Sequence, residues 1–147
     1  MIKYYVQHNL LDSFEHSDFD AIVHGCNCFH TMGAGIAGEI ARRFPVAVEA
    51  DKRTEYSDWG KLGDYSVAAT VYGDIINGYT QYRPGKCPRD QLYANICELF
   101  TKLNVDYKGK VLGIPKIGAG IAGGNWEEIA EIIQDVTPDV GIVVLYL

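Results

Sequence analysis

Two patterns of apolar and polar residues alternate along the chain. Short runs such as residues 21–23 and 140–145 are typical of strands buried in a parallel sheet. Longer segments repeat apolar residues at helical spacing, as Ile36, Ile40 and Phe44 do within residues 35–44. The expected strands are residues 3–7, 20–25, 65–72, 75–81, 111–115 and 140–145. The expected helices are residues 35–44, 90–103 and 125–134, with shorter helices within 12–19 and 46–57.

Turn-forming and capping residues separate these elements. Pro45 directly follows the first long helix and is expected to end it. Residues 73–74 separate two strands and predict a hairpin. Asp90 is placed to cap one helix, and Asn125 with Glu128 forms a near capping box for another. Because strands alternate with helices and no linker interrupts them, the sequence predicts one domain, residues 1–147, with an α/β sandwich fold and a mixed, largely parallel sheet.

One hexapeptide occurs twice, at residues 33–38 and at residues 118–123. Each copy follows an expected strand and leads towards the start of a helix. Glycine lets the backbone approach a ligand closely, and amides at a helix N-terminus attract anions. A tight turn that allows close packing would explain either copy by itself. Two copies at the same edge of a sheet favour a pair of loops that hold the two halves of a diphosphate.

The charge of the chain narrows the classes of ligand. A formal net charge of −6 argues against broad nucleic-acid binding, which needs a basic surface. Basic residues are sparse around both hexapeptides, so a phosphate would be met mainly by backbone N–H groups and helix ends. No stretch has the apolar length of a signal peptide or a membrane span, so we expect a cytoplasmic protein with no membrane partner. The four cysteines are then expected to be reduced thiols: Cys26, Cys28, Cys87 and Cys97.

The spacing of histidines, cysteines and glycines argues against a metal site and a nucleotide-cofactor site. His24, Cys26, Cys28 and His30 alternate, which would bring zinc ligand types to one side of an extended chain. Their spacing is tighter than usual for structural zinc, so no metal is expected. Both hexapeptides match G-x-G-x-x-G, but residues 26–32 separate the first copy from its strand, and no acidic strand end follows at the right distance. The lysine of a P-loop is also missing, and no cofactor is expected.

Three stretches together resemble the macro domain family: residues 20–27, 32–37 and 114–120. Residues 62–64 and 79–81 also match the spacing of that family. The resemblance covers nearly the whole chain and implies a three-layer α/β/α sandwich that binds ADP-ribose and its derivatives. The short first strand and the glycines before Trp126 are most similar to a compact branch. That branch includes the yeast-type ADP-ribose-1''-phosphate phosphatase, the terminal ADP-ribosyl-glutamate hydrolase and the macro domains of antitoxins that remove ADP-ribose from DNA.

The resemblance implies a role for each matching residue. Asn9 stands where the family has an acidic residue that accepts from the adenine amino group, and its amide oxygen can also accept. The amide of Leu10 would face the adenine ring, and Asn27 would hold the distal ribose. Tyr146 is a candidate to stack on adenine, with packing as the other explanation. The loop residues that would surround the phosphates and the distal ribose are Gly33, Ala34, Gly35, Ile36, Ala37, Gly118, Ala119, Gly120, Ile121 and Ala122.

Departures from the family pattern bear on the chemistry. The glutamate hydrolase of the compact branch is understood to use a lysine and an aspartate, and the matching positions here are Gln81 and Ala122. Neither side chain can form a Schiff base or act as its general base. No cysteine begins the Cys-x₅-Arg loop of cysteine-dependent phosphatases.

The expected activity is therefore ADP-ribose binding with hydrolysis of ADP-ribose-1''-phosphate to ADP-ribose and phosphate. Asn27 and the loop amides would stabilise the charge, and His30 would deprotonate the attacking water. An exposed loop histidine is the other interpretation of His30. Two alternatives remain open, namely a non-catalytic reader of ADP-ribose and an ADP-ribosyl hydrolase that acts on modified protein or nucleic acid.

Overall fold

A six-stranded sheet in the order β1-β6-β5-β2-β4-β3 forms the centre of the protein, in a computed structural model that describes all 147 residues. The strands are β1 (Ile2–Gln7), β2 (Ala21–Cys26), β3 (Tyr65–Thr70), β4 (Gly73–Tyr79), β5 (Val111–Ile114) and β6 (Gly141–Tyr146). Neighbouring strands are parallel except β3 and β4, which form the predicted hairpin. The expectation of a mixed, largely parallel sheet is confirmed.

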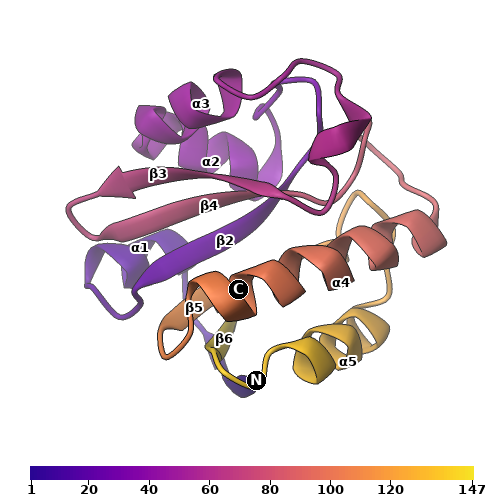
Figure 1. Cartoon of the computed structure of the whole chain (residues 1–147). Helices are drawn as coiled ribbons and strands as arrows, with labels where there is room; N and C mark the ends of the chain where they lie inside the picture. Colours follow the sequence, from indigo (N-terminus) through magenta and orange to yellow (C-terminus); the bar gives the residue numbers. More distant parts are fainter.

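Helices cover both faces of this sheet (Figure 1). One face carries α1 (Leu10–Glu15), α2 (Gly35–Arg43) and α3 (Pro45–Lys52), and the other carries α4 (Arg89–Asp106) and α5 (Trp126–Val136). Successive residues of β2 point to opposite faces, so Ile22 packs with the first helical layer and Val23 with the second. The two resulting cores confirm the three-layer α/β/α sandwich. None of the helices has the length and apolar character needed to cross a membrane.

The helix ends agree with most of the predicted capping. The α2 helix ends at Arg43, and Pro45 begins α3, where its missing N–H costs nothing. The side-chain oxygen of Asn125 accepts from the amide of Glu128 at 3.1 Å, as expected for the cap of α5. The assignment of Asp90 was wrong. The cap residue of α4 is Pro88, and Asp90 lies inside the first turn, where its negative charge still favours the helix dipole.

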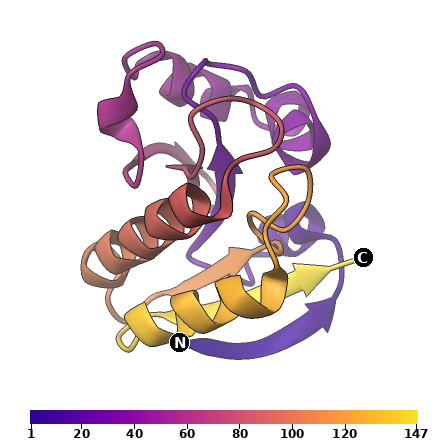
Figure 2. The same ribbon diagram turned by 90° about the vertical axis from the view of Figure 1, so that its right-hand side faces the viewer.

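The parallel strands bring the two hexapeptides to one edge of the sheet. The first copy follows the carboxyl end of β2 and opens α2, on one face. The second follows the carboxyl end of β5 and precedes α5, on the other face. Strands β2 and β5 are direct neighbours, with Ala21 paired to Leu112 and Ile22 to Gly113. In Figure 2, β1 and β6 run side by side in the same direction below these loops.

Candidate functional site

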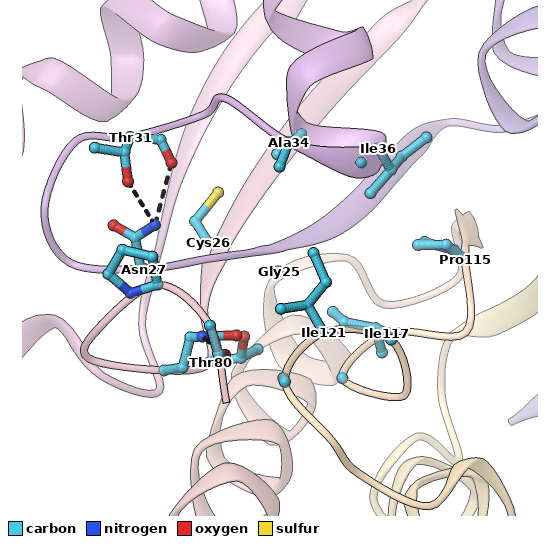
Figure 3. Close-up of a pocket in the computed structure, with 18 of the residues that line it drawn as sticks. Gly25, Cys26, Asn27, Thr31, Ala34, Ile36, Thr80, Pro115, Ile117 and Ile121 are labelled. Carbon is cyan, nitrogen blue, oxygen red and sulfur yellow. Dashed lines mark hydrogen bonds between the residues drawn. The ribbon is translucent and has the colours of Figure 1, made fainter. Parts of the chain in front are cut away.

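A cavity of about 580 Å³ opens at the carboxyl edge of the sheet, between the two hexapeptides (Figure 3). Its size and position match the place where ligands of open α/β sheets bind. The close-up shows Ala34 and Ile36 on one side of the space and Ile117 and Ile121 on another. The lining residues are Gly25, Cys26, Asn27, Thr31, Gly33, Ala34, Gly35, Ile36, Ala37, Thr80, Gln81, Pro84, Gly85, Pro115, Lys116, Ile117, Gly118, Gly120, Ile121 and Ala122.

The first hexapeptide forms a wall at the start of α2. Gly35 has a positive φ of 57°, a conformation that glycine adopts at little cost. The cap residue Ala34 has no side-chain oxygen to bond the first amides of the helix. A Cβ built on Gly33 or Gly35 would meet no atom within 4 Å, so both positions border open space. Backbone N–H groups and the positive end of the helix dipole are therefore available to an anion in the cavity.

The second hexapeptide forms the opposite wall. Gly118 has a positive φ of 78°, and its carbonyl accepts from the amide of Gly124 at 2.8 Å. A Cβ on Gly124 would lie 2.7 Å from that carbonyl oxygen, so this glycine is required for packing. A Cβ on Gly120 would meet nothing within 4 Å. The second wall is therefore tightly packed where Gly118 meets Gly124 and open to the cavity at Gly120.

Asn27 holds the turn that leads into the first hexapeptide. Its side-chain nitrogen donates to the carbonyl oxygen of Thr31 at 3.1 Å and to the hydroxyl of Thr31 at 2.8 Å (Figure 3). Its side-chain oxygen accepts from the amide of Phe29 at 2.8 Å. All of these bonds are local, and Asn27 and Thr31 both line the cavity. The side chain of Asn27 thus fixes the shape of the cavity at this end.

A third wall was not predicted from the sequence. It is formed by the segment of residues 80–85, of which 80, 81, 84 and 85 line the cavity. The side-chain nitrogen of Gln81 holds this segment by donating to the carbonyl oxygens of Arg83 at 2.6 Å and Gly85 at 2.7 Å. The amide of Cys28 donates to the carbonyl of Tyr82 at 2.9 Å, and the amide of Cys87 donates to the carbonyl of Ala122 at 3.0 Å. The segment therefore joins the two glycine-rich walls. The sequence had pointed only to Gln81, at the position that matches the catalytic lysine of the glutamate hydrolase, and to the place of the segment after a strand that ends at the same edge.

Several residues predicted for the site do not line this cavity, and their predicted roles in binding stay predictions. The side-chain oxygen of Asn9 caps α1 by accepting from the amide of Asp12 at 3.0 Å. Leu10 is buried in the first helical layer. The Nε2 atom of His30 lies 2.8 Å from the carbonyl oxygen of Thr54. None of these three lines the cavity, and neither does Ala119 or Tyr146.

Ionisable side chains in and under the cavity are few. No carboxylate or imidazole lines the cavity, and Lys116 is its only charged side chain. Burial raises the pKa of the Cys26 thiol well above its usual value and that of Cys28 to about 11. Both thiols therefore stay protonated at neutral pH, which makes them poor nucleophiles.

A buried polar network lies beneath Cys26. The Nε2 atom of His24 lies 2.6 Å from the side-chain oxygen of Asn77, whose nitrogen donates to the carbonyl of Ala47 and the hydroxyl of Ser66. Asn77 oxygen must therefore accept, so Nε2 of His24 carries the proton. Burial lowers the pKa of His24 and keeps its ring neutral. With His24 and His30 bonded in this way, no three His, Cys, Asp or Glu side chains come together as a ligand group for a metal.

Comparison with known proteins identifies the family. A family model described as Macro domain matches residues 23–133. This chain belongs to the macro domain family. It is 37% identical over 154 residues to an uncharacterized 17.5 kDa protein of Enterobacteria phage T4, a match that covers 99% of this chain and 96% of the relative.

Solved structures of macro domains share the fold. The macrodomain of Mycobacterium tuberculosis DarG has a TM-score of 0.75 at 26% identity, and the match covers 100% of this chain and 98% of that one. A Trypanosoma brucei macrodomain in complex with ADP-ribose has a TM-score of 0.70 at 14% identity, with 99% and 64% coverage. The resemblance to the macro domain family is confirmed. The placement in the compact branch stays a prediction.

Proposed function

We propose that this macro domain binds ADP-ribose in the cavity between its two hexapeptides. The observation that carries the proposal is the pair of glycine-rich loops that face one space from opposite sides of the sheet. Open positions at Gly33, Gly35 and Gly120 let a ligand reach the backbone on both walls. Backbone amides and a helix N-terminus suit the two phosphates of a diphosphate. The ADP-ribose in the related Trypanosoma brucei structure supports the same ligand.

The walls suggest an orientation for the ligand. The diphosphate would lie between residues 33–37 and 118–122. The distal ribose would point to the end formed by Asn27, Thr31 and Thr80, where amide and hydroxyl groups line the cavity. The base would lie towards the carboxyl end of β6, where Tyr146 has 39% of its surface exposed.

Hydrolysis of ADP-ribose-1''-phosphate is the activity that we propose for this site. The polar end near Asn27 supports it, because a terminal phosphate on the distal ribose would enter there. Water would attack the phosphorus atom and the bond from phosphorus to the ribose oxygen would break, giving ADP-ribose and inorganic phosphate. Protonated cysteines and the absence of a lysine at position 81 favour water over a covalent nucleophile.

The same cavity contains no general base, so turnover is expected to be slow. His30 would have to leave Thr54 to activate a water in the cavity. A protein that only reads ADP-ribose would have the same binding walls and no activity. An ADP-ribosyl hydrolase acting on modified protein or nucleic acid would need a base or nucleophile that neither Gln81 nor Ala122 provides.

Two measurements on the wild-type protein test the proposal. Isothermal titration calorimetry should detect ADP-ribose binding and weaker binding of ADP, which lacks the distal ribose. Incubation with ADP-ribose-1''-phosphate should release phosphate. ADP-ribose binding without phosphate release would refute the phosphatase activity and support a protein that only reads ADP-ribose. Loss of ADP-ribose from ADP-ribosylated protein or DNA, assayed in parallel, would favour the hydrolase instead.

A further inference from the structure

Lys116 is the one charged side chain that lines the cavity. It is the second residue after β5, between Pro115 and Ile117, which also line the cavity. Its carbonyl accepts from the amide of Ala119 at 3.2 Å, which fixes the turn at the start of the second hexapeptide. The side chain itself is exposed to solvent.

The ammonium group of Lys116 has no anionic partner in the protein. None of the ion pairs of the chain includes it, and no protein acceptor forms a hydrogen bond with it. Its nitrogen lies 5.3 Å from the centre of the Tyr146 ring, a weak contact with the face of an exposed aromatic side chain. A lysine held this loosely keeps its three donors free for a ligand.

We propose that Lys116 is the charge-recognition residue of this site and pairs with the diphosphate of the bound ligand. The inference rests on the proposed binding of ADP-ribose. The protein has a net charge of −6 and the ligand is an anion, so the overall field opposes their association. Uncharged backbone amides provide the geometry of the phosphate site. Lys116 provides its only full positive charge, and it exchanges the ring of Tyr146 for a phosphate when the ligand enters.

The experiment compares three variants of the whole protein. Lys116→Met removes the charge and keeps most of the length, whereas Lys116→Arg keeps the charge. Lys108→Met causes the same change in net charge on an exposed residue of the turn before β5, at the other end of that strand. Calorimetry would measure the Kd of ADP-ribose and of adenosine, which has no phosphate, at several salt concentrations.

Lys116→Met should weaken ADP-ribose binding roughly tenfold and flatten its dependence on salt. Adenosine binding should be unchanged, and Lys116→Arg and Lys108→Met should behave as wild type. Equal weakening of ADP-ribose and adenosine, or an unchanged salt dependence, would overturn the role of Lys116 while ADP-ribose binding by the wild type still stood. Failure of the wild type to bind ADP-ribose would overturn both proposals.

Discussion

The glycines of the two hexapeptides have different tasks although their sequences are identical. Gly33, Gly35 and Gly120 border open space, so they give a ligand access to the backbone. Gly38 is packed, because a Cβ there would lie 3.1 Å from the backbone of Gly33. Gly124, just after the second copy, is packed more tightly still. Residue identity alone could not separate these tasks, since they depend on which atoms the fold brings opposite each glycine.

A pair of substitutions tests this division. Gly124→Ala should lower the free energy of unfolding by about 1–3 kcal/mol, because the new methyl group meets the carbonyl of Gly118 and the side chain of Ile129. Gly120→Ala should leave stability unchanged and weaken ADP-ribose binding, because its methyl group enters the open space. Urea denaturation and calorimetry would measure the two effects. Equal losses of stability in Gly124→Ala and Gly120→Ala would contradict the distinction between a packed and an open glycine.

Asn27→Ala should affect turnover more than binding. The substitution removes the side-chain bonds to Thr31 and Phe29, so the turn at the distal-ribose end becomes less ordered. The phosphates would still be held by the hexapeptide amides. We expect a modest rise in the Kd of ADP-ribose and a larger fall in phosphate release. Asn27→Asp keeps the oxygen that accepts from the amide of Phe29. Its rate of phosphate release should therefore lie between those of the wild type and Asn27→Ala. Unchanged turnover in Asn27→Ala would show that the residue is misplaced in the proposal.

At the scale of elements, Asn9 caps a helix, in addition to the role in adenine binding that was predicted from the sequence. Its side-chain oxygen is engaged in capping α1. Asn9→Ala should therefore lower the free energy of unfolding by about 1 kcal/mol, and Asn9→Asp should preserve it, because aspartate caps equally well. Urea denaturation of both variants measures the effect. Identical stabilities of Asn9→Ala and the wild type would mean that the cap contributes nothing.

The elements themselves were largely predictable. Strand-like runs found all six strands, helical spacing found α2 and α4, and the Asn125 cap found the start of α5, because these signals are local in the chain. The cap of α4 was assigned wrongly. The rule that ligands bind at the carboxyl ends of parallel strands brought both hexapeptides into one site. The wall formed by residues 80–85 was not predictable, because it is held by backbone bonds from Cys28 and Cys87 that join distant segments. Lys116 was missed for a similar reason, since only the fold shows that no other charge faces the cavity.

At the scale of the whole molecule, one buried histidine links stability to pH. Burial lowers the pKa of His24 below its ordinary value of 6.5, and the unfolded chain therefore binds the proton more readily than the folded protein. The neutral, buried side chain of His24 makes its full contribution to the free energy of unfolding above pH 6.5. This contribution is lost as the pH falls below that value towards the lowered pKa. Urea denaturation at pH 7.5, 6 and 5 should show decreasing stability.

His24→Gln provides the control for this pH dependence. Glutamine can donate to the side-chain oxygen of Asn77 and does not titrate. The variant should be less stable at pH 7.5, because glutamine fills the buried site less well, and its stability should fall less steeply towards pH 5. A slope equal to that of the wild type would assign the acid sensitivity to other groups.

The two cavity walls belong to opposite layers of the sandwich. The first hexapeptide opens α2, which packs in one core, and the second contributes Ala122 to the other core, next to the preceding residue Ile117. A ligand held by both walls would therefore add a non-covalent link between the two layers, beside the sheet and the backbone bonds of Cys28 and Cys87. Local opening of either wall would then require release of the ligand. Amide hydrogen exchange in α2 and in the segment before α5 should slow together on saturation, as one cooperative unit.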